Sequence, residues 1–310
     1  MYTPLDAFLA RQPIMVLDGA LATELERRGA DLVDPLWSAK YLVEQPELIR
    51  RVHWEYFNAG ADVATTATYQ ATFEGFARRG FDGPAAANLM RSAVTLAMEA
   101  RDEFWALRDN RKGRLRPLVA ASVGPYGAFL ADGSEYRGHY DLRERALKQF
   151  HRPRLEVLAE AGADLLAFET IPCLSEAVAL AELLKEFPSL HAWMSFSCQD
   201  GSQNCEGQPL TECAAAMQPF PQIAAVGVNC SRPEHIASAL RLMGAHTDKP
   251  LLAYPNSGEQ YDAVAKTWHG HVESFAGQSR SWYEAGARLI GGCCRTTPGD
   301  IAMLRASYRG

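Results

Sequence analysis

The chain has 310 residues, 47% of them hydrophobic and 22% charged, with a formal net charge of −6 at pH 7. This composition is typical of a globular protein with a sizeable core, and the acidic balance argues against nucleic-acid binding, which usually needs a basic surface. No apolar run approaches the roughly 20 residues of a membrane-spanning helix, and residues 1–11 lack the pattern of a secretory signal, so we expect a cytoplasmic protein without membrane contact.

Eight short apolar segments recur along the chain, and each is followed by glycine, proline, cysteine or polar residues. Most are continuous rather than alternating, which is typical of parallel strands that are buried on both faces. The predicted strands cover residues 14–17, 63–66, 118–123, 165–168, 192–196, 223–228, 251–254 and 289–291.

Helical patterns separate these strands. Pro46 and Pro84 precede two of them, and proline suits the first helical position because its missing N–H has no partner there. Thr297-Pro298 resembles a helix N-cap followed by such a proline. The predicted helices cover residues 47–57, 85–107, 142–161, 176–187, 212–217, 234–242, 274–285 and 301–306.

The alternation of strand and helix runs through the chain without a linker-like stretch. An Ala-Gly-Ala motif at 59–61, 161–163 and 285–287 marks three helix-to-strand joints, where glycine suits the residue just past a helix. This pattern predicts an α/β fold with one (β/α)8 barrel domain over residues 1–310. A doubly wound open sheet is the alternative, although no GxGxxG motif follows the first strand.

Two connections are longer than a barrel requires. They cover residues 124–140 and 255–270, and both are rich in glycine or aromatic residues. Because each follows a predicted strand, we expect both at the C-terminal face of the barrel, where active sites gather. There they could cover a bound substrate.

The predicted strand ends carry polar and sulfur-containing residues that a barrel would bring to one rim. Asp18 follows the first strand, Glu169 the fourth, and Cys230 the sixth. The eighth strand runs into Gly291-Gly292-Cys293-Cys294. Neighbouring side chains on a strand point to opposite faces, so two adjacent thiols reach one point only if the backbone turns, which these glycines permit.

The seven cysteines are an odd number, and a reducing cytoplasm favours metal or catalytic roles over disulfides. Cys230, Cys293 and Cys294 fall on near-neighbour strands, and three thiolates with an open fourth position suit zinc. The other four, Cys173, Cys198, Cys205 and Cys213, are interpreted as small buried apolar residues. A redox-active or structural cysteine cluster remains an open alternative.

A zinc ion with three thiolates is an anionic centre and therefore a poor activator of water. It is suited instead to holding a substrate thiol as a nucleophilic thiolate. A positively charged electrophile, such as a sulfonium or quaternary ammonium methyl donor, would be drawn to it. Aromatic rings could add cation–π attraction. The candidate rings are Tyr69, Tyr126, Tyr254 and Trp268.

These residues resemble the motifs of zinc-dependent homocysteine S-methyltransferases. The matching motifs, spread in order over nearly the whole chain, are Asp18-Gly19-Ala20, residues 122–127, residues 168–170, Gly227-Val228-Asn229-Cys230, residues 254–259 and residues 291–298. The resemblance is closest to the bacterial and plant branch that uses S-methylmethionine, and to some extent S-adenosylmethionine, as methyl donor. Betaine- and folate-using relatives share the barrel and the cysteines.

The resemblance implies that Cys230, Cys293 and Cys294 bind zinc, with the homocysteine sulfur as fourth ligand. It also implies that Asp18 and Glu169 hold the homocysteine amino group, while backbone amides at Gly19 receive its carboxylate. Tyr69, Asn229 and Tyr254 complete the predicted substrate-binding set, and no residue is predicted as a general acid or base. Selenocysteine as acceptor, betaine as donor, and a monomer or a small homo-oligomer remain open at this point.

Overall fold

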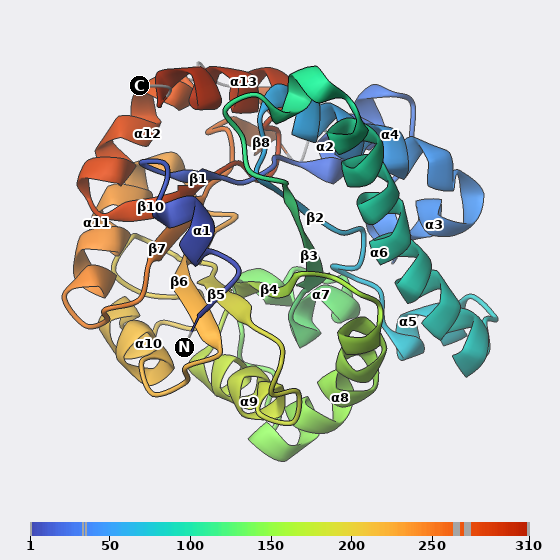
Figure 1. The fold of residues 1–310 in the computed structure, drawn as a ribbon. Coiled ribbons are helices and arrows are strands. Elements are labelled where there is room, and N and C mark those ends of the chain that lie inside the picture. The colour runs from blue at the N-terminus through green and yellow to red at the C-terminus, as the bar shows by residue number, and fades with distance from the viewer. Residues whose placement is uncertain (1, 33, 35, 263–266, 270–273, 309–310) are drawn as a thin grey trace.

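Eight parallel strands form a barrel in the computed structural model, which describes residues 2–32, 34, 36–262, 267–269 and 274–308 (Figure 1). Around the sheet the order is β1-β10-β7-β6-β5-β4-β3-β2. The strands are β1 (Met15–Val16), β2 (Val63–Thr65), β3 (Leu118–Val123), β4 (Leu165–Ile171), β5 (Ala192–Phe196), β6 (Ile223–Asn229), β7 (Leu251–Tyr254) and β10 (Ala287–Ile290). Each coincides with a predicted strand.

The ring closes where the first strand meets the second. Leu17 forms a parallel bridge with Val63, and the Asp62 amide donates to the Val16 carbonyl at 2.7 Å. On its other side β1 pairs with β10, with Met15 opposite Leu289. The predicted (β/α)8 barrel is therefore confirmed, and the open-sheet alternative is wrong.

The outer layer consists of helices that surround the sheet in Figure 1. Those that coincide with predicted helices are α4 (Pro46–Ala59), α6 (Gly83–Ala106), α8 (Glu144–Glu160), α9 (Leu174–Leu184), α10 (Leu210–Met217), α11 (Pro233–Gly244), α12 (Phe275–Glu284) and α13 (Pro298–Ser307). The predicted N-cap of α13 is confirmed, because Thr297 and Asp300 form a capping box.

The core has two layers, one inside the barrel and one between strands and helices. On β4, Leu165 and Ala167 belong to the inner cluster, whereas Leu166 and Phe168 belong to the outer one. Both faces of the strand are apolar for this reason, which explains the continuous apolar runs in the sequence. Helix α1 (Asp6–Leu9) adds Phe8 to the inner cluster.

Several short elements have no counterpart in the sequence prediction. They are α2 (Leu21–Arg27), α3 (Tyr41–Glu44), α5 (Phe73–Arg78), α7 (Tyr126–Leu130) and the 3-10 helices η1 (Trp37–Lys40), η2 (Arg108–Arg111) and η3 (Ser134–Tyr136). The long connection after β3 holds α7 and η3. The connection after β7 holds an antiparallel pair, β8 (Gln260–Asp262) and β9 (Thr267–His269). The side chain of Trp268 lies outside the described part of the structure.

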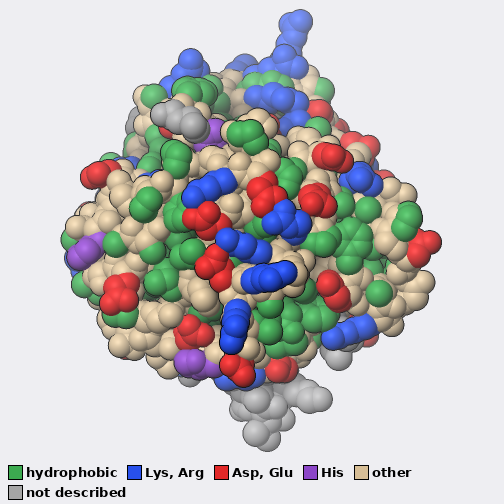
Figure 2. Space-filling view, turned by 90° about the horizontal axis from the view of Figure 1, so that it is seen from below, with side chains coloured by type: hydrophobic (Ala, Val, Ile, Leu, Met, Phe, Trp, Pro, Cys, Tyr) green, Lys and Arg blue, Asp and Glu red, His purple; other side chains and the backbone are tan. Residues whose placement is uncertain are grey.

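Charged residues of both signs alternate on the outer wall around α8 and α9, the side of the barrel seen in Figure 2. Lys148 pairs with Glu144 at 2.6 Å, and Lys185 pairs with Glu182 at 2.8 Å. Such mixed exposed pairs keep a surface solvated but contribute little stability. Within the described residues, no helix combines the length and apolar character needed to cross a membrane.

Candidate active site

A cavity of about 340 Å³ opens at the C-terminal ends of the strands. All the predicted metal-binding and substrate-binding residues line it, although they come from six different strands or the turns that follow them. They are Asp18, Gly19, Tyr69, Glu169, Asn229, Cys230, Tyr254, Cys293 and Cys294. Because α/β barrels place their active sites at this face, the cavity is the candidate active site.

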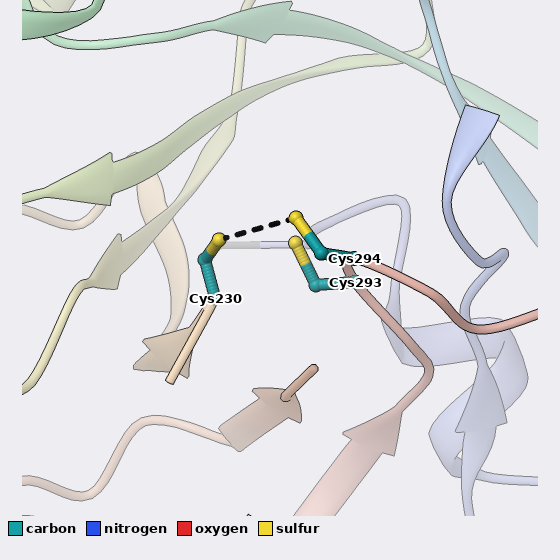
Figure 3. A group of neighbouring side chains, drawn as sticks. All are labelled: Cys230, Cys293 and Cys294. Carbon is teal, nitrogen blue, oxygen red and sulfur yellow. Dashed lines mark hydrogen bonds between the residues drawn. The ribbon is translucent and has the colours of Figure 1, made fainter. Parts of the chain in front are cut away.

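Three thiols converge on one side of the cavity (Figure 3). The sulfur atoms of Cys230, Cys293 and Cys294 all lie within 4.8 Å of one another. The Cys230 and Cys294 sulfurs are 3.7 Å apart. The arrangement can therefore hold a metal ion between three sulfur ligands.

The turn that carries two of these thiols fits tightly against neighbouring strands. A Cβ on Gly291 would lie 2.5 Å from the Leu17 Cβ, and one on Gly292 would collide with the Thr296 side chain. The Gly292 amide donates to the Asp18 carbonyl at 2.9 Å, which joins this turn to the end of β1. The glycines thus serve a close approach between the backbones of the first and last strands.

Two non-glycine residues near the thiol cluster adopt the left-handed backbone conformation. Cys230 has φ of 48° and Arg295 has φ of 69°, whereas neither Gly291 nor Gly292 has a positive φ. The conformational freedom of these glycines is therefore not what lets adjacent cysteines reach one point. A non-glycine residue in this region is uncommon and signals a backbone held in place by its surroundings.

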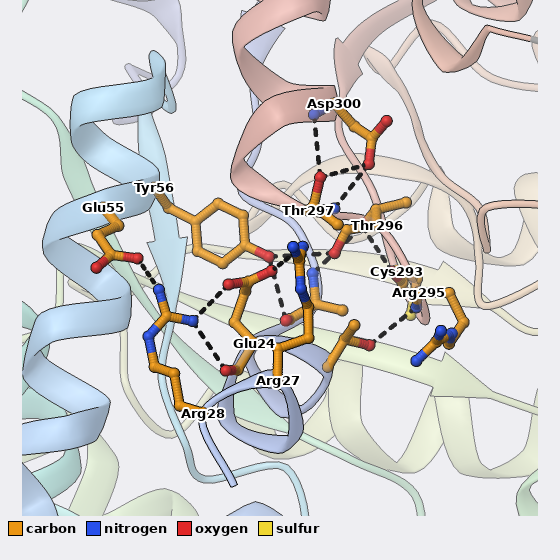
Figure 4. Close-up of polar contacts among 12 residues, drawn as sticks. Glu24, Arg27, Arg28, Glu55, Tyr56, Cys293, Arg295, Thr296, Thr297 and Asp300 are labelled. Carbon is orange, nitrogen blue, oxygen red and sulfur yellow. Dashed lines mark hydrogen bonds and ion pairs between the residues drawn. The ribbon is translucent and has the colours of Figure 1, made fainter.

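A network of hydrogen bonds holds the cysteine turn from behind (Figure 4). The Thr296 hydroxyl donates to the Cys293 carbonyl at 2.6 Å, and the Arg295 amide donates to Thr23 Oγ1 at 3.0 Å. From α4, the Tyr56 hydroxyl lies 3.1 Å from the Ala20 carbonyl and 3.3 Å from the Thr296 carbonyl. These contacts fix the turn relative to the end of the first strand.

Two buried carboxylates face the same cavity as the thiols. Asp18 accepts hydrogen bonds from the Thr65 amide at 2.8 Å and from its hydroxyl at 3.1 Å, and Glu169 accepts one from the Ser122 hydroxyl. Burial raises the pKa of Asp18 to about 8 and that of Glu169 to about 7. Among the described residues that line the cavity, none is Lys, Arg or His. A cationic ligand would therefore be stabilised here.

Asn229 fixes the strand segment that carries Glu169. Its side-chain carbonyl accepts from the Thr170 amide and its amide group donates to the Thr170 hydroxyl, both at 2.8 Å. Thr170 has φ of 60°, and the pairing of β4 with β5 shifts register between Phe168 and Ile171. The amide of Asn229 thus supports an irregularity in β4 at the position of the carboxylate.

The aromatic candidates separate into two groups. Tyr69 and Tyr254 line the cavity, and the Tyr254 hydroxyl accepts a hydrogen bond from Trp193 at 3.1 Å. Tyr126 does not line it. Its ring packs against Tyr140 and Phe150, with centroid distances of 5.4 and 4.9 Å. Of the candidate rings, Tyr126 therefore does not face the site, because α7 turns its ring into this aromatic cluster.

Two cavity residues have no signal in the sequence prediction. Both Glu135 and Tyr136 belong to η3, and the Tyr136 hydroxyl lies 2.9 Å from the Cys230 sulfur. They occur in a loop without periodicity, 94 residues before the nearest of the three cysteines. The sequence predicts that their loop, residues 124–140, lies at this face of the barrel, but it does not single out these two residues.

Comparison with known proteins gives a consistent result. The family model of homocysteine S-methyltransferase matches residues 15–308. The homocysteine S-methyltransferase YbgG of Bacillus subtilis is 55% identical over 308 residues, which cover 99% of this chain and 98% of that protein. A selenocysteine Se-methyltransferase of Brassica oleracea is 47% identical over 301 residues, covering 93% of this chain and 87% of that protein.

A solved structure is similar to this chain in both fold and sequence. The crystal structure of the homocysteine methyltransferase MmuM from Escherichia coli, in its metallated form, superposes with a TM-score of 0.89. Sequence identity is 50%, and the match covers 98% of this chain and 99% of the other. With the family model and these relatives spanning nearly the whole chain, the protein belongs to the homocysteine S-methyltransferase family.

Proposed function

We propose that this chain transfers a methyl group from a sulfonium donor, S-methylmethionine or S-adenosylmethionine, to the sulfur of homocysteine, producing methionine. One observation carries the proposal: three clustered thiols and two buried carboxylates share a cavity whose described lining has no cationic side chain. Homocysteine offers a thiol at one end and an ammonium group at the other. Each end therefore has a chemically matched partner in the cavity.

The thiol cluster fits zinc as its metal. Zinc accepts thiolate ligands at about 2.3 Å, so two ligands of one tetrahedral ion lie about 3.8 Å apart. The Cys230 and Cys294 sulfurs, at 3.7 Å, match this spacing. Bound by Cys230, Cys293 and Cys294, zinc would favour the thiolate form of the homocysteine sulfur at neutral pH.

The remaining residues position the substrate. Asp18 and Glu169 hold the ammonium group, since two carboxylates that are costly to bury as anions gain a cation. The backbone at Gly19 receives the substrate carboxylate, Asn229 holds the segment around Glu169, and Tyr69 and Tyr254 shape the walls. No general acid is needed, because the donor leaves as a neutral thioether. Alignment of sulfur and methyl group can contribute several kcal/mol.

A donor panel tests the reaction directly. Purified reduced protein is incubated with homocysteine and each of S-methylmethionine, S-adenosylmethionine, betaine and methyl-folate, and methionine is measured. We expect turnover with the sulfonium donors and about one zinc per chain. Full activity after zinc removal would contradict the zinc proposal. Zinc-free protein with a disulfide among the three cysteines would support a redox cluster instead.

Selenocysteine is a second candidate acceptor. The Brassica relative is named for selenocysteine methylation, and that acceptor has a selenol in place of the thiol and one methylene group fewer than homocysteine. We place homocysteine first because the other reported relatives carry its name. The ratio of the kcat/KM values for homocysteine and selenocysteine, measured with one donor, shows which acceptor is preferred.

We further propose that residues 1–310 work as one domain in the cytoplasm. The described site needs the end of the first strand and the turn after the last one, so no smaller part contains it. Free thiols also require a reducing compartment to stay free.

A further inference from the structure

The 3-10 helix η3 brings a further carboxylate to the cavity, in addition to Asp18, Asp34 and Glu169. Its residues Glu135 and Tyr136 line the cavity together with Gly133, which precedes the helix. The Tyr136 hydroxyl lies 2.9 Å from the Cys230 sulfur, so η3 lies beside the thiol cluster. Nothing in the assigned binding of homocysteine uses this carboxylate.

The backbone of η3 is held firmly. The Ser197 hydroxyl donates to the Glu135 carbonyl at 3.0 Å, and the His139 amide just after the helix donates to Glu206 at 2.8 Å. On the other side, a Cβ on Gly127 would lie 2.5 Å from the Glu135 nitrogen, so α7 packs directly against η3. The position of Glu135 at the cavity is therefore built into the fold.

The carboxylate of Glu135 differs from the others in the cavity. Asp18 accepts hydrogen bonds from Thr65, Glu169 from Ser122, and Asp34 pairs with Arg79. The Oε2 atom of Glu135 is buried and has no hydrogen-bond partner within the described part of the chain. Burial also raises the pKa of the Glu135 carboxyl. A buried oxygen without a partner is costly and points to a missing ligand.

We propose that Glu135 binds the positive charge of the methyl donor and is a specificity-determining residue for it. This inference rests on the proposed function. Homocysteine brings one ammonium group, for which Asp18 and Glu169 are sufficient, whereas a sulfonium donor brings a further positive charge. The described lining offers no other carboxylate oxygen that is both buried and without a partner.

The chemistry of the transfer determines which kinetic constant should respond. A bond forms between the homocysteine sulfur and the methyl carbon as the bond from that carbon to the donor sulfur breaks. The electron pair of the broken bond stays on the donor sulfur, which becomes a neutral thioether, and the thiol proton of homocysteine goes to solvent. A counter-ion of the charged donor stabilises the ground state at least as much as the transition state, so its loss raises KM rather than lowering kcat.

Glu135→Gln tests the proposal, with Asp132→Asn as its matched control. Both substitutions remove one negative charge within four residues, but Asp132 is exposed and outside the cavity, and asparagine can still accept from Ser134. At saturating homocysteine, we expect Glu135→Gln to raise the KM for S-methylmethionine about tenfold or more with kcat little changed. The KM for homocysteine, the zinc content and the melting temperature should stay at wild-type values, and Asp132→Asn should match wild type throughout.

A binding titration supplies a readout independent of turnover. Wild type should bind S-methylmethionine more tightly than methionine, whose sulfur is an uncharged thioether, and Glu135→Gln should lose this preference if Glu135 contacts the sulfonium. A sulfonium donor without an amino group locates the charge: an equal loss for both donors places Glu135 at the sulfonium, and a loss for S-methylmethionine alone places it at the ammonium group.

An unchanged donor KM in Glu135→Gln would overturn the proposal, as would equal rises in the donor and homocysteine KM values. Failure of the proposed function has a different signature. In that case the wild-type protein would fail to methylate homocysteine with any of the sulfonium donors, whatever the variant does.

Discussion

Among the glycines that line the cavity, Gly292 has the least room for a side chain. Any side chain there would meet Thr296, whose hydroxyl holds the carbonyl of Cys293. The amide of Gly292 also donates a hydrogen bond to the carbonyl of Asp18. One glycine therefore sets the distance between the residue proposed to hold the substrate amino group and the residues proposed to hold the metal.

The three cysteines should act as one set. Replacing Cys230, Cys293 or Cys294 singly by serine should abolish stoichiometric zinc binding and reduce kcat/KM at least about 100-fold, because two thiolates cannot complete the centre. Metal analysis and methionine formation measure the two effects. The fold should persist, since the described turn is held by backbone contacts rather than by the sulfurs.

Cys205→Ser is the control for these variants. Cys205 is a free, half-buried cysteine that does not line the cavity. Its replacement should leave zinc content and activity unchanged. Loss of zinc in this variant, or retention of zinc in all three of the others, would show that the metal lies elsewhere.

The sequence predicts individual site residues where they follow directly after an apolar strand that can be recognised in the sequence. Glu169 stands out because a carboxylate at the end of an apolar strand needs a partner, and the cysteines stand out through their pairing beside two glycines. Glu135 has no such context. Its importance comes from an unpaired oxygen, which is a property of the packed loop and not of the local sequence.

The loop after β3 is supported by a buried ionic cluster between α8 and α9. The Tyr126 amide donates to Glu176 at 2.6 Å, and Glu176 in turn lies 2.7 Å from His151. Arg154 donates to the Gly124 carbonyl and to His151 Nδ1. Burial raises the pKa of Glu176 to about 7 and lowers that of Arg154 to about 10. Two helices thus fix the start of the loop that carries η3.

Removing Arg154, the cation of this cluster, should lower the stability of the fold. Arg154→Met removes the buried cation and its hydrogen bonds to the Gly124 carbonyl and to His151, so we expect the free energy of unfolding to fall by about 3–5 kcal/mol. Arg152→Met on the same helix removes only an exposed pair with Glu186 and should cost less than about 1 kcal/mol. Urea denaturation of both variants checks this difference, and equal losses would contradict the role of the buried cluster.

At the level of elements, the strands and long helices follow from hydrophobic periodicity, because burial imposes that pattern. The short elements do not. Helix α7 has five residues and η3 has three, too few to show a period, and both owe their conformation to packing against α8, α9 and the loop after β5. The part of the site that sequence patterns missed lies in these elements.

His53 should make a destabilising contribution to the whole molecule on acidification. This histidine is fully buried in α4, neither ring nitrogen has a partner among the described residues, and burial lowers its pKa to about 4. The unfolded chain binds the proton near pH 6.5, so stability falls as pH drops from about 6.5 towards 4. Between pH 7 and 5 the loss from this group is about 2 kcal/mol.

Comparison with His53→Leu isolates this contribution. Buried carboxyls with raised pKa values, such as Glu176, work in the opposite direction and are common to both proteins. On going from pH 7 to pH 5, the change in unfolding free energy should therefore be more favourable to the folded state in the variant than in wild type, by about 2 kcal/mol. Identical pH profiles would mean that His53 is not kept neutral by the fold.

The pairing of β1 with β10 has a consequence for the order of assembly. Asp18 leaves the ribosome long before Cys293 and Cys294, because the Gly292–Asp18 hydrogen bond joins residues 274 positions apart (292 − 18). Contacts this distant in sequence form late. If zinc binds here, its uptake by a growing or refolding chain would therefore report the moment at which β1 pairs with β10.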